Sequence, residues 1–282
     1  MGRGMAAAAA LALAMPAAAQ DAFRIGVVAL PGEEAAIDDL AATKSAYSTA
    51  LGLPVEVMAA RSYAALAEAQ IEGRIDYGVY SAAAFAAASL RCGCLSPVAA
   101  PVDADGTVGL RAVLIARGDG TGRLAVGAPD SLATRLVPLA ASPQARAAQA
   151  EGRLVEAGSA AEAEALFLAG KVDGFFGWVP AGAEDGEDAG GSLARLGVAG
   201  VDPASFRIVW RSPLLRYGPH AVRDDIAPER AERLARLLEG VAGGGANPGR
   251  RILRGHGGFA AVTAADYAPA MEAVSALSNP GR

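Results

Sequence analysis

The sequence is poor in the residues and motifs on which catalysis and metal binding usually depend. It has two histidines, His220 and His256, and two cysteines, Cys92 and Cys94, in 282 residues. No G-x-S-x-G, H-E-x-x-H or P-loop motif is present. The histidines are far apart in sequence and no second cysteine pair follows the first, so a zinc site has little support. We therefore predict that the protein is not an enzyme and holds no metal or cofactor.

Positive charge is also scarce. The chain has 25 basic and 30 acidic residues, a formal net charge of −5 at pH 7, and its only lysines are Lys44 and Lys171. A nucleic-acid-binding protein usually carries a basic excess or a basic patch. We therefore expect no nucleic-acid partner.

Long apolar runs are absent after the first twenty residues, and a bilayer-spanning helix needs about twenty of them. The first residues instead have the pattern of an export signal. Arg3 supplies a positive charge, residues 6–15 form a short apolar stretch, and residues 16–19 (PAAA) resemble a cleavage site. We predict cleavage near Ala19 and a soluble mature protein in the periplasm.

The cysteines stand one residue apart, as Cys92-Gly-Cys94. Outside the cytosol, neighbouring thiols oxidise readily, although a disulfide across one residue closes a tight ring. We treat this pair as a candidate disulfide that staples the loop after a helix predicted at 82–90. A redox site is the less favoured alternative.

Aromatic residues make up only 5% of the chain, so a core of Leu, Val and Ile is expected. Residues 51–57, 62–66 and 73–81 follow a strand, helix, strand pattern, which predicts a βαβ unit with parallel strands. The segment from Gly158-Ser159 to Asp173 repeats the segment from Arg61-Ser62 to Asp76. The repetition predicts two similar α/β lobes. Ligands bind such sheets at the carboxyl ends of their strands.

Eight segments, in one order, resemble the phosphonate/phosphite/phosphate substrate-binding proteins of bacterial ABC importers. They are LGLPVEV, SYAALAEA, GRIDYGVYSAAAF, DGTVGLRAVLIAR, APDSLATRLVP, GKVDGFF, IVWRSPLL and GFAAVTAADYAPAM, between about residues 22 and 275. The resemblance implies a type II periplasmic-binding fold, in which two α/β lobes with mixed sheets are joined by two crossing strands. We expect a signal peptide at 1–19, the first lobe at 20–115, the second at 116–210, and a return to the first lobe at 211–282.

Several polar positions of the family's ligand site differ in this chain. The family's Ser-Thr-Ser-Gly run becomes Ser131-Leu-Ala-Thr134, which keeps one hydroxyl at the start of a helix. Leu110 occupies a position where the family has a tyrosine, and Gly218 occupies one where the family has an acidic residue. Ser159 occupies a position where the family has a histidine, and a second acidic residue of the family aligns near Pro180. The family's tyrosine is kept at Tyr63. Fewer charge-assisted hydrogen bonds are then available, which disfavours an aminoalkylphosphonate.

The expected ligand-binding residues lie at the starts of predicted helices or beside the ends of predicted strands. Ser131 and a helix N-terminus are suited to an oxyanion, and Arg135 would assist if it pointed inward, the alternative being a solvated position. Tyr80, Trp178 and Tyr217 would form an apolar or stacking wall, the alternative being core packing. The residues expected to bind the ligand are Tyr63, Tyr80, Ser81, Ser131, Thr134, Ser159 and Trp178.

These features favour an exported, monomeric solute-binding protein. It would bind a small anionic ligand between two lobes that close by a hinge motion, and deliver it to an ABC permease. The alternative is a sensory module of the same fold that passes a ligand signal to a signalling partner.

Overall fold

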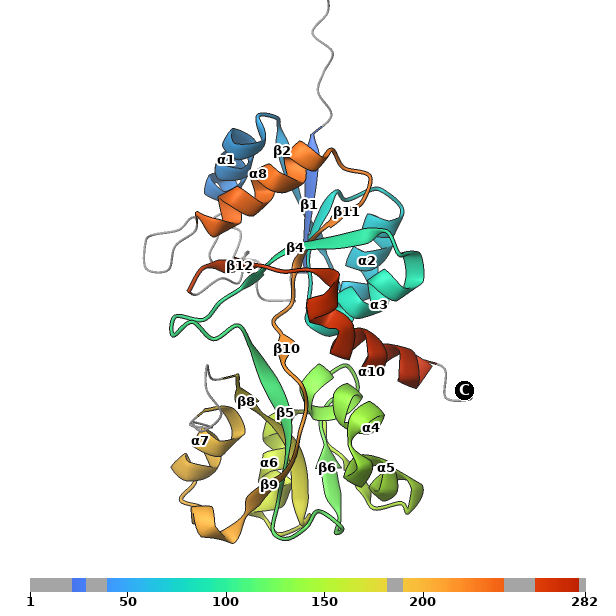
Figure 1. The fold of residues 1–282 in the computed structure, drawn as a ribbon, viewed down its shortest axis with the longest axis vertical. Helices are drawn as coiled ribbons and strands as arrows, with labels where there is room; N and C mark the ends of the chain where they lie inside the picture. The colour runs from blue at the N-terminus through green and yellow to red at the C-terminus, as the bar shows by residue number, and fades with distance from the viewer. Residues whose placement is uncertain (1–21, 29–39, 182–189, 241–256, 279–282) are drawn as a thin grey trace, which may run out of the picture.

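The computed structural model describes residues 22–28, 40–181, 190–240 and 257–278, which form two lobes, one above the other in Figure 1. Each lobe contains a mixed β-sheet flanked by helices, which confirms the predicted two-lobed α/β architecture. The predicted signal segment, residues 1–19, lies outside the described residues.

The first lobe is built on a sheet with the strand order β12-β4-β11-β3-β1-β2 in the described part of the chain. β1 pairs in parallel with β2 and β3, whereas β11 runs antiparallel between β3 and β4. Helices α1 and α8 pack on one face and α2 and α3 on the other. The bounds are β1 Phe23–Val28, α1 Leu40–Leu51, β2 Val55–Ala60, α2 Tyr63–Ile71, β3 Tyr77–Val79, α3 Ala82–Cys92, β4 Leu95–Pro101, β11 His220–Arg223, α8 Pro228–Glu239 and β12 Phe259–Ala261.

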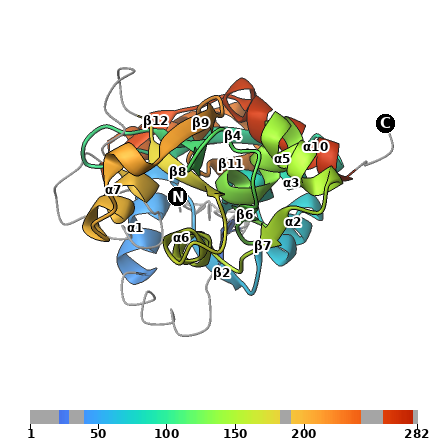
Figure 2. The ribbon, with the colours of Figure 1, turned by 90° about the horizontal axis from the view of Figure 1, so that it is seen from below.

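The second lobe has the strand order β10-β5-β8-β6-β7, and β9 also pairs with β5. Successive side chains of a strand point to opposite faces, so Val113 and Ile115 pack with α6 and α7 while Leu114 packs with α4 and α5. Figure 2 shows these helices on opposite sides of the strands. The bounds are β5 Gly109–Ala116, β6 Leu124–Val126, the π-helix η2 Leu132–Leu136, α4 Val137–Ala141, α5 Pro143–Ala150, β7 Leu154–Glu156, α6 Ala160–Leu168, β8 Gly174–Pro180, α7 Gly191–Val198, β9 Arg207–Arg211 and β10 Leu215–Arg216.

The repeated sequence segments have the same local structure in both lobes. Ser62 and Ser159 are N-caps with nearly the same backbone angles, and each accepts a hydrogen bond from the amide three residues later, at 3.2 and 3.1 Å. Asp76 and Asp173 each accept a backbone amide from the neighbouring strand, both at 2.8 Å. The two lobes therefore share one βαβ plan.

The chain crosses between the sheets twice, at residues 102–108 and again at 217–219. After the first crossing, β5 belongs to the second sheet from Gly109 onward. Before the second crossing, β10 belongs to the second sheet up to Arg216. Judged by sheet membership, the second lobe thus starts before the expected residue 116 and ends after the expected residue 210. The crossing segments are held together by Tyr217, whose amide donates to Val108 O at 3.3 Å and whose hydroxyl donates to Asp103 at 2.5 Å.

The last helix, α10 (Ala268–Ser278), follows the 3-10 turn η4 (Ala264–Tyr267) and packs against both lobes. It contacts α3 of the first lobe and α4 and η2 of the second, as Figure 1 shows beside the crossing strands. The residues after the second crossing therefore do not belong to the first lobe alone.

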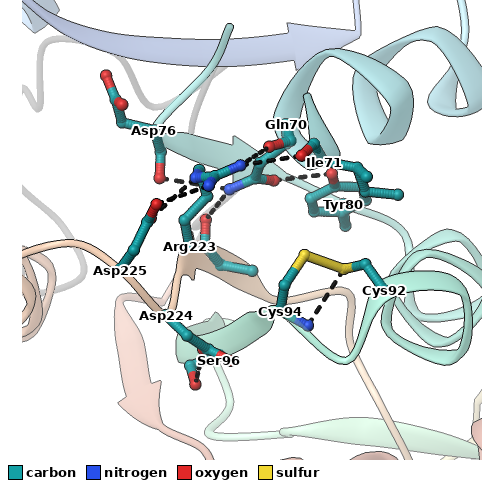
Figure 3. The surroundings of a disulfide bond; sticks show 11 residues. Gln70, Ile71, Asp76, Tyr80, Cys92, Cys94, Ser96, Arg223, Asp224 and Asp225 are labelled. Atoms are coloured by element: carbon teal, nitrogen blue, oxygen red, sulfur yellow. Dashed lines mark hydrogen bonds and ion pairs between the residues drawn. A yellow bond between two sulfur atoms is a disulfide. The ribbon is translucent and has the colours of Figure 1, made fainter. Parts of the chain in front are cut away.

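Cys92 and Cys94 are joined by a disulfide with an S–S distance of 2.11 Å (Figure 3). Gly93 between them is the C-cap of α3 in the left-handed conformation, with φ of 57°, and its amide donates to Ser89 O. The disulfide thus joins the end of α3 to the residue before β4. This is the position of the local staple expected from the sequence.

Candidate functional site

A cavity of about 480 Å³ lies between the lobes. The first lobe contributes the residues that follow β3 and β4, and the second contributes strand ends and the first turn of η2. The strand β10 and the crossing segment after it complete the wall. The lining consists of Val79, Tyr80, Ser81, Ala82, Pro101, Asp103, Leu110, Ser131, Leu132, Ala133, Trp178, Leu215, Arg216, Tyr217, Gly218 and His220.

Four of the seven expected site residues line this cavity: Tyr80, Ser81, Ser131 and Trp178. The other three lie elsewhere. Tyr63 begins α2 and packs against the core of the first lobe. Thr134 is buried behind Ser131, and Ser159 is an exposed N-cap of α6.

Ser131 begins the helical segment that faces the cavity from the second lobe. Its Oγ accepts hydrogen bonds from the amide of Thr134 at 3.3 Å and from the hydroxyl of Thr134 at 2.6 Å. Because both contacts use the oxygen as acceptor, the Ser131 proton is left to donate to a ligand. The amides of Leu132 and Ala133 open the helix and have no intrahelical acceptor. Thr134 therefore orients the donor instead of binding the ligand itself.

Tyr80 contributes its ring and backbone to the cavity, but its hydroxyl points into the first lobe (Figure 3). The hydroxyl donates to Gln70 Oε1 at 2.7 Å, and Gln70 Nε2 donates to Ala221 O and Asp76 O. The side chain is 2% exposed, and burial raises the pKa of Tyr80 far above its ordinary value of 10.0. Tyr80 is thus a fixed wall, in line with the core-packing alternative.

Trp178 is supported from behind by a charged network in the second lobe. Its amide donates to Ser192 Oγ at 3.1 Å, and Ser192 donates to the buried Glu164 at 2.8 Å. Arg195 pairs with both oxygens of Glu164, at 2.7 and 2.6 Å, and its guanidinium carbon lies 5.0 Å from the centre of the indole ring. This pairing raises the pKa of Arg195 above its ordinary value. The indole is therefore held in place before any ligand arrives.

Arg216 is a lining residue that sequence reasoning missed. It ends the two-residue strand β10, and its Nε is buried without a hydrogen-bond partner among the described residues. Its positive charge contributes to lowering the pKa of Asp266. A buried guanidinium nitrogen without an acceptor is costly, and the residue also lines the cavity, where its positive charge is available to an anion.

His220, also missed, is fully buried at the start of β11. Its Nδ1 is hydrogen-bonded to the hydroxyl of Tyr77, which in turn contacts the hydroxyl of Tyr47 at 3.0 Å. Burial raises the pKa of Tyr77 well above its ordinary value. The ring of His220 packs edge-on against Tyr77 and Phe259. It forms a rigid part of the cavity wall.

Asp103 and Tyr217 occupy the crossing segments. Tyr217 lines the cavity, but its hydroxyl donates to Asp103; burial, and then this contact, raise the pKa of Tyr217. Asp103 brings a negative charge to a lining that also holds the positive Arg216. With opposite charges present, the cavity is not suited to a highly charged anion.

Arg135 does not line the cavity. It pairs with Glu156 through both terminal nitrogens and donates to Gly127 O at 3.5 Å. The inward orientation considered from the sequence does not occur. By contrast, positions where the family's polar residues are replaced, Leu110, Leu132 and Gly218, do line the cavity.

A family model described as "ABC transporter, phosphonate, periplasmic substrate-binding protein" matches residues 25–267. The chain belongs to this family. It is therefore a periplasmic substrate-binding protein of an ABC transporter, which confirms the resemblance found in the sequence. The family is one of transporter binding proteins and not of enzymes, and it does not favour the sensory alternative.

Solved structures support the fold at low sequence identity. The binding protein component of a phosphonate ABC transporter from Pseudomonas aeruginosa is 18% identical, with a TM-score of 0.52, over 88% of this chain and 83% of that chain. PhnD1 from Prochlorococcus marinus, solved with methylphosphonate, is 13% identical, with a TM-score of 0.56, over 91% and 98%. A Xanthomonas citri protein solved with chloride is 15% identical, with a TM-score of 0.58, over 92% and 98%. No curated protein matched the sequence.

The described residues contain no group of three or more His, Cys, Asp or Glu side chains placed to hold a metal ion. None of the helices in the described ranges has the length and hydropathy needed to span a membrane.

Proposed function

We propose that this substrate-binding protein captures a small anionic ligand, a phosphonate-like or other oxyanion, in the cavity between its lobes, and presents it to the permease as a monomer. The observation that carries the proposal is that both lobes and a crossing strand line one cavity of about 480 Å³. This volume lies within the range of about 300–1,000 Å³ that is usual for small-molecule sites.

The donors in this cavity suit an anion. The Ser131 hydroxyl and the first amides of its helix belong to the second lobe, and Arg216 lies on the crossing strand. The first lobe contributes Ser81, whose Oγ accepts from the Ala84 amide at 3.2 Å and therefore keeps its own proton to donate. A ligand bound by donors from both lobes would favour the closed form. Two relatives of this fold were solved with small anions, PhnD1 with methylphosphonate and the Xanthomonas citri protein with chloride.

We further propose that the mature protein reaches the periplasm after a signal peptide at residues 1–19 is removed near Ala19. Arg3 and the apolar stretch at 6–15 support this. Mass spectrometry of the purified periplasmic protein should show a new N-terminus at Gln20 or close to it. A protein of full length in that fraction would exclude the cleavage.

Thermal-shift screening with phosphate, phosphite, phosphonates, sulfonates and small carboxylates tests the ligand class. A ligand at about 100 times its Kd stabilises by roughly 2.7 kcal/mol. X-ray scattering with a ligand that shifts the melting temperature should show a monomer that becomes more compact. If no anion raises the melting temperature, the proposed ligand class is wrong.

A matched pair of N-cap serines tests the site. Ser131→Ala should weaken binding of the anion that screening finds. Ser62→Ala makes the same change at the exposed N-cap of α2, so it should cost roughly 1 kcal/mol of stability and leave affinity unchanged. Equal effects of the two substitutions on affinity would place the anion elsewhere.

A further inference from the structure

Arg216 has the surroundings of a ligand-binding group and not of a structural ion pair. Its Nε is buried, and none of the described residues supplies a hydrogen-bond acceptor to it. Other partly buried arginines of this chain are satisfied internally: Arg24 by Asp76, and Arg195 by Glu164. An unsatisfied buried donor typically costs about 1–3 kcal/mol, and more when charged. Arg216 also lines the cavity, so an anionic group bound there would interact with its positive charge.

Most of the remaining lining is apolar. Leu110, Leu132 and Leu215 contribute aliphatic side chains, and Trp178 contributes part of its indole. The cavity, at about 480 Å³, is far larger than the roughly 30 Å³ that one water molecule occupies in the liquid. An inorganic oxyanion would fill a small part of this volume and would leave the apolar walls in contact with water.

The position of Trp178 is fixed before ligand binding. Arg195 lies against its ring, Ser192 accepts its amide, and Glu164 holds both of these residues. Gly191 makes this packing possible, since a Cβ there would lie 2.3 Å from Trp178 O and 2.8 Å from the ring. A preorganised aromatic surface lowers the entropic cost of binding an apolar group.

This inference rests on the proposed function of the cavity as the ligand site. We infer that the ligand is an organic oxyanion whose acidic group binds Arg216. Its apolar body, about the size of a phenyl ring, packs against Trp178 and the leucines. Charge-assisted hydrogen bonds fix the acidic group. Burial of the body supplies the selectivity over inorganic anions.

Calorimetric titration of the full-length mature protein with phosphate, methylphosphonate and phenylphosphonate tests this inference. The acidic group stays nearly the same while the apolar body grows. Phenylphosphonate is expected to bind at least tenfold more tightly than phosphate, with methylphosphonate between them. Trp178→Ala should reduce the preference for phenylphosphonate over methylphosphonate.

Arg216→Met tests whether Arg216 binds the acidic group of the ligand. It should weaken binding of every probe at least tenfold and leave the melting temperature of the ligand-free protein unchanged or raised, because an unsatisfied donor has been removed. Arg146→Met is the control, since Arg146 is exposed and outside the lining. Its affinities should equal those of the wild type.

The outcomes separate the two levels of the hypothesis. Phosphate binding as tightly as phenylphosphonate would overturn the apolar body and keep the anion site. Unchanged affinity in Arg216→Met, with a lower melting temperature, would make Arg216 structural. If none of the three probes binds, this inference fails, whereas the proposed anionic ligand class fails only if no anion of the thermal-shift screen raises the melting temperature.

Discussion

Replacing Gly218 by alanine tests how closely the returning chain approaches the cavity wall. A Cβ at this position would lie 2.0 Å from Tyr80 O and 2.7 Å from the Cα of Ser81. Both are main-chain atoms, so neither can rotate away, and the crossing segment must shift. Overpacking of this kind costs about 1–3 kcal/mol, and the severity of the contact favours the upper end. At roughly 2–4 °C per kcal/mol, the melting temperature should fall by about 6–12 °C.

Thermal unfolding followed by circular dichroism, without ligand at pH 7, measures this effect. Gly197→Ala is the matched control, because Gly197 is exposed within α7 and a Cβ there would meet nothing within 4 Å. Alanine should stabilise that helix by roughly 0.5–1 kcal/mol. Replacing glycine by alanine should therefore lower the melting temperature at position 218 and raise it at position 197.

The same contact explains why this position holds no acid. An aspartate would place its Cβ on Tyr80 O before its carboxylate reached the cavity. The Gly218 variant should also lose ligand affinity, because Tyr80, Ser81 and Gly218 all line the cavity. A Gly218→Ala protein with the melting temperature and affinity of the wild type would refute the close approach.

Two further predictions concern single hydrogen-bonded groups. Tyr80→Phe should lower stability by about 1–3 kcal/mol, because Gln70 Oε1 loses its buried donor, but should leave ligand affinity within about twofold; an affinity loss at full stability would return the hydroxyl to the binding site. Asp266 accepts the amide of Thr263 at 2.7 Å, which lowers the pKa of Asp266 below its ordinary value of 3.8. The pKa of Asp266 is lower in the folded protein than in the unfolded chain. The ionised carboxylate therefore stabilises the fold fully at pH values well above 3.8, and this stabilisation is lost as the pH falls through the folded pKa. Urea unfolding should thus show the stabilities of wild type and Asp266→Asn converging as the pH falls below about 5, and a constant difference would contradict this.

Features with a local cause could be predicted from the sequence. Ser62 and Ser159 cap helices, and Gly73 and Gly170 adopt φ of 74° and 66° where each helix turns toward the next strand. Capping and left-handed turns depend on the residue itself and its neighbours. The repetition of these signals in both halves was therefore sufficient to predict two lobes of one plan.

Features that depend on distant segments could not be predicted in this way. Strand β11 is four residues long and lies between β3 and β4 only because the chain returns from the second lobe. Arg216 occupies a strand of two residues, and its unsatisfied Nε becomes visible only when the packed walls are known. An arginine between Leu215 and Tyr217 carries no local sign that it lines a cavity, so this charge was missed.

Strand order also decides which helix caps reach the cavity. Four serines that follow strands, Ser62, Ser81, Ser131 and Ser159, cap helices in the same manner. The first and last follow β2 and β7, which end their sheets, whereas Ser81 and Ser131 follow the inner strands β3 and β6. Only the latter two line the cavity. The sequence predicted Ser81, Ser131 and Ser159 as ligand-binding residues, and the order of strands, which is set by pairing across the chain, brings only the first two to the cavity.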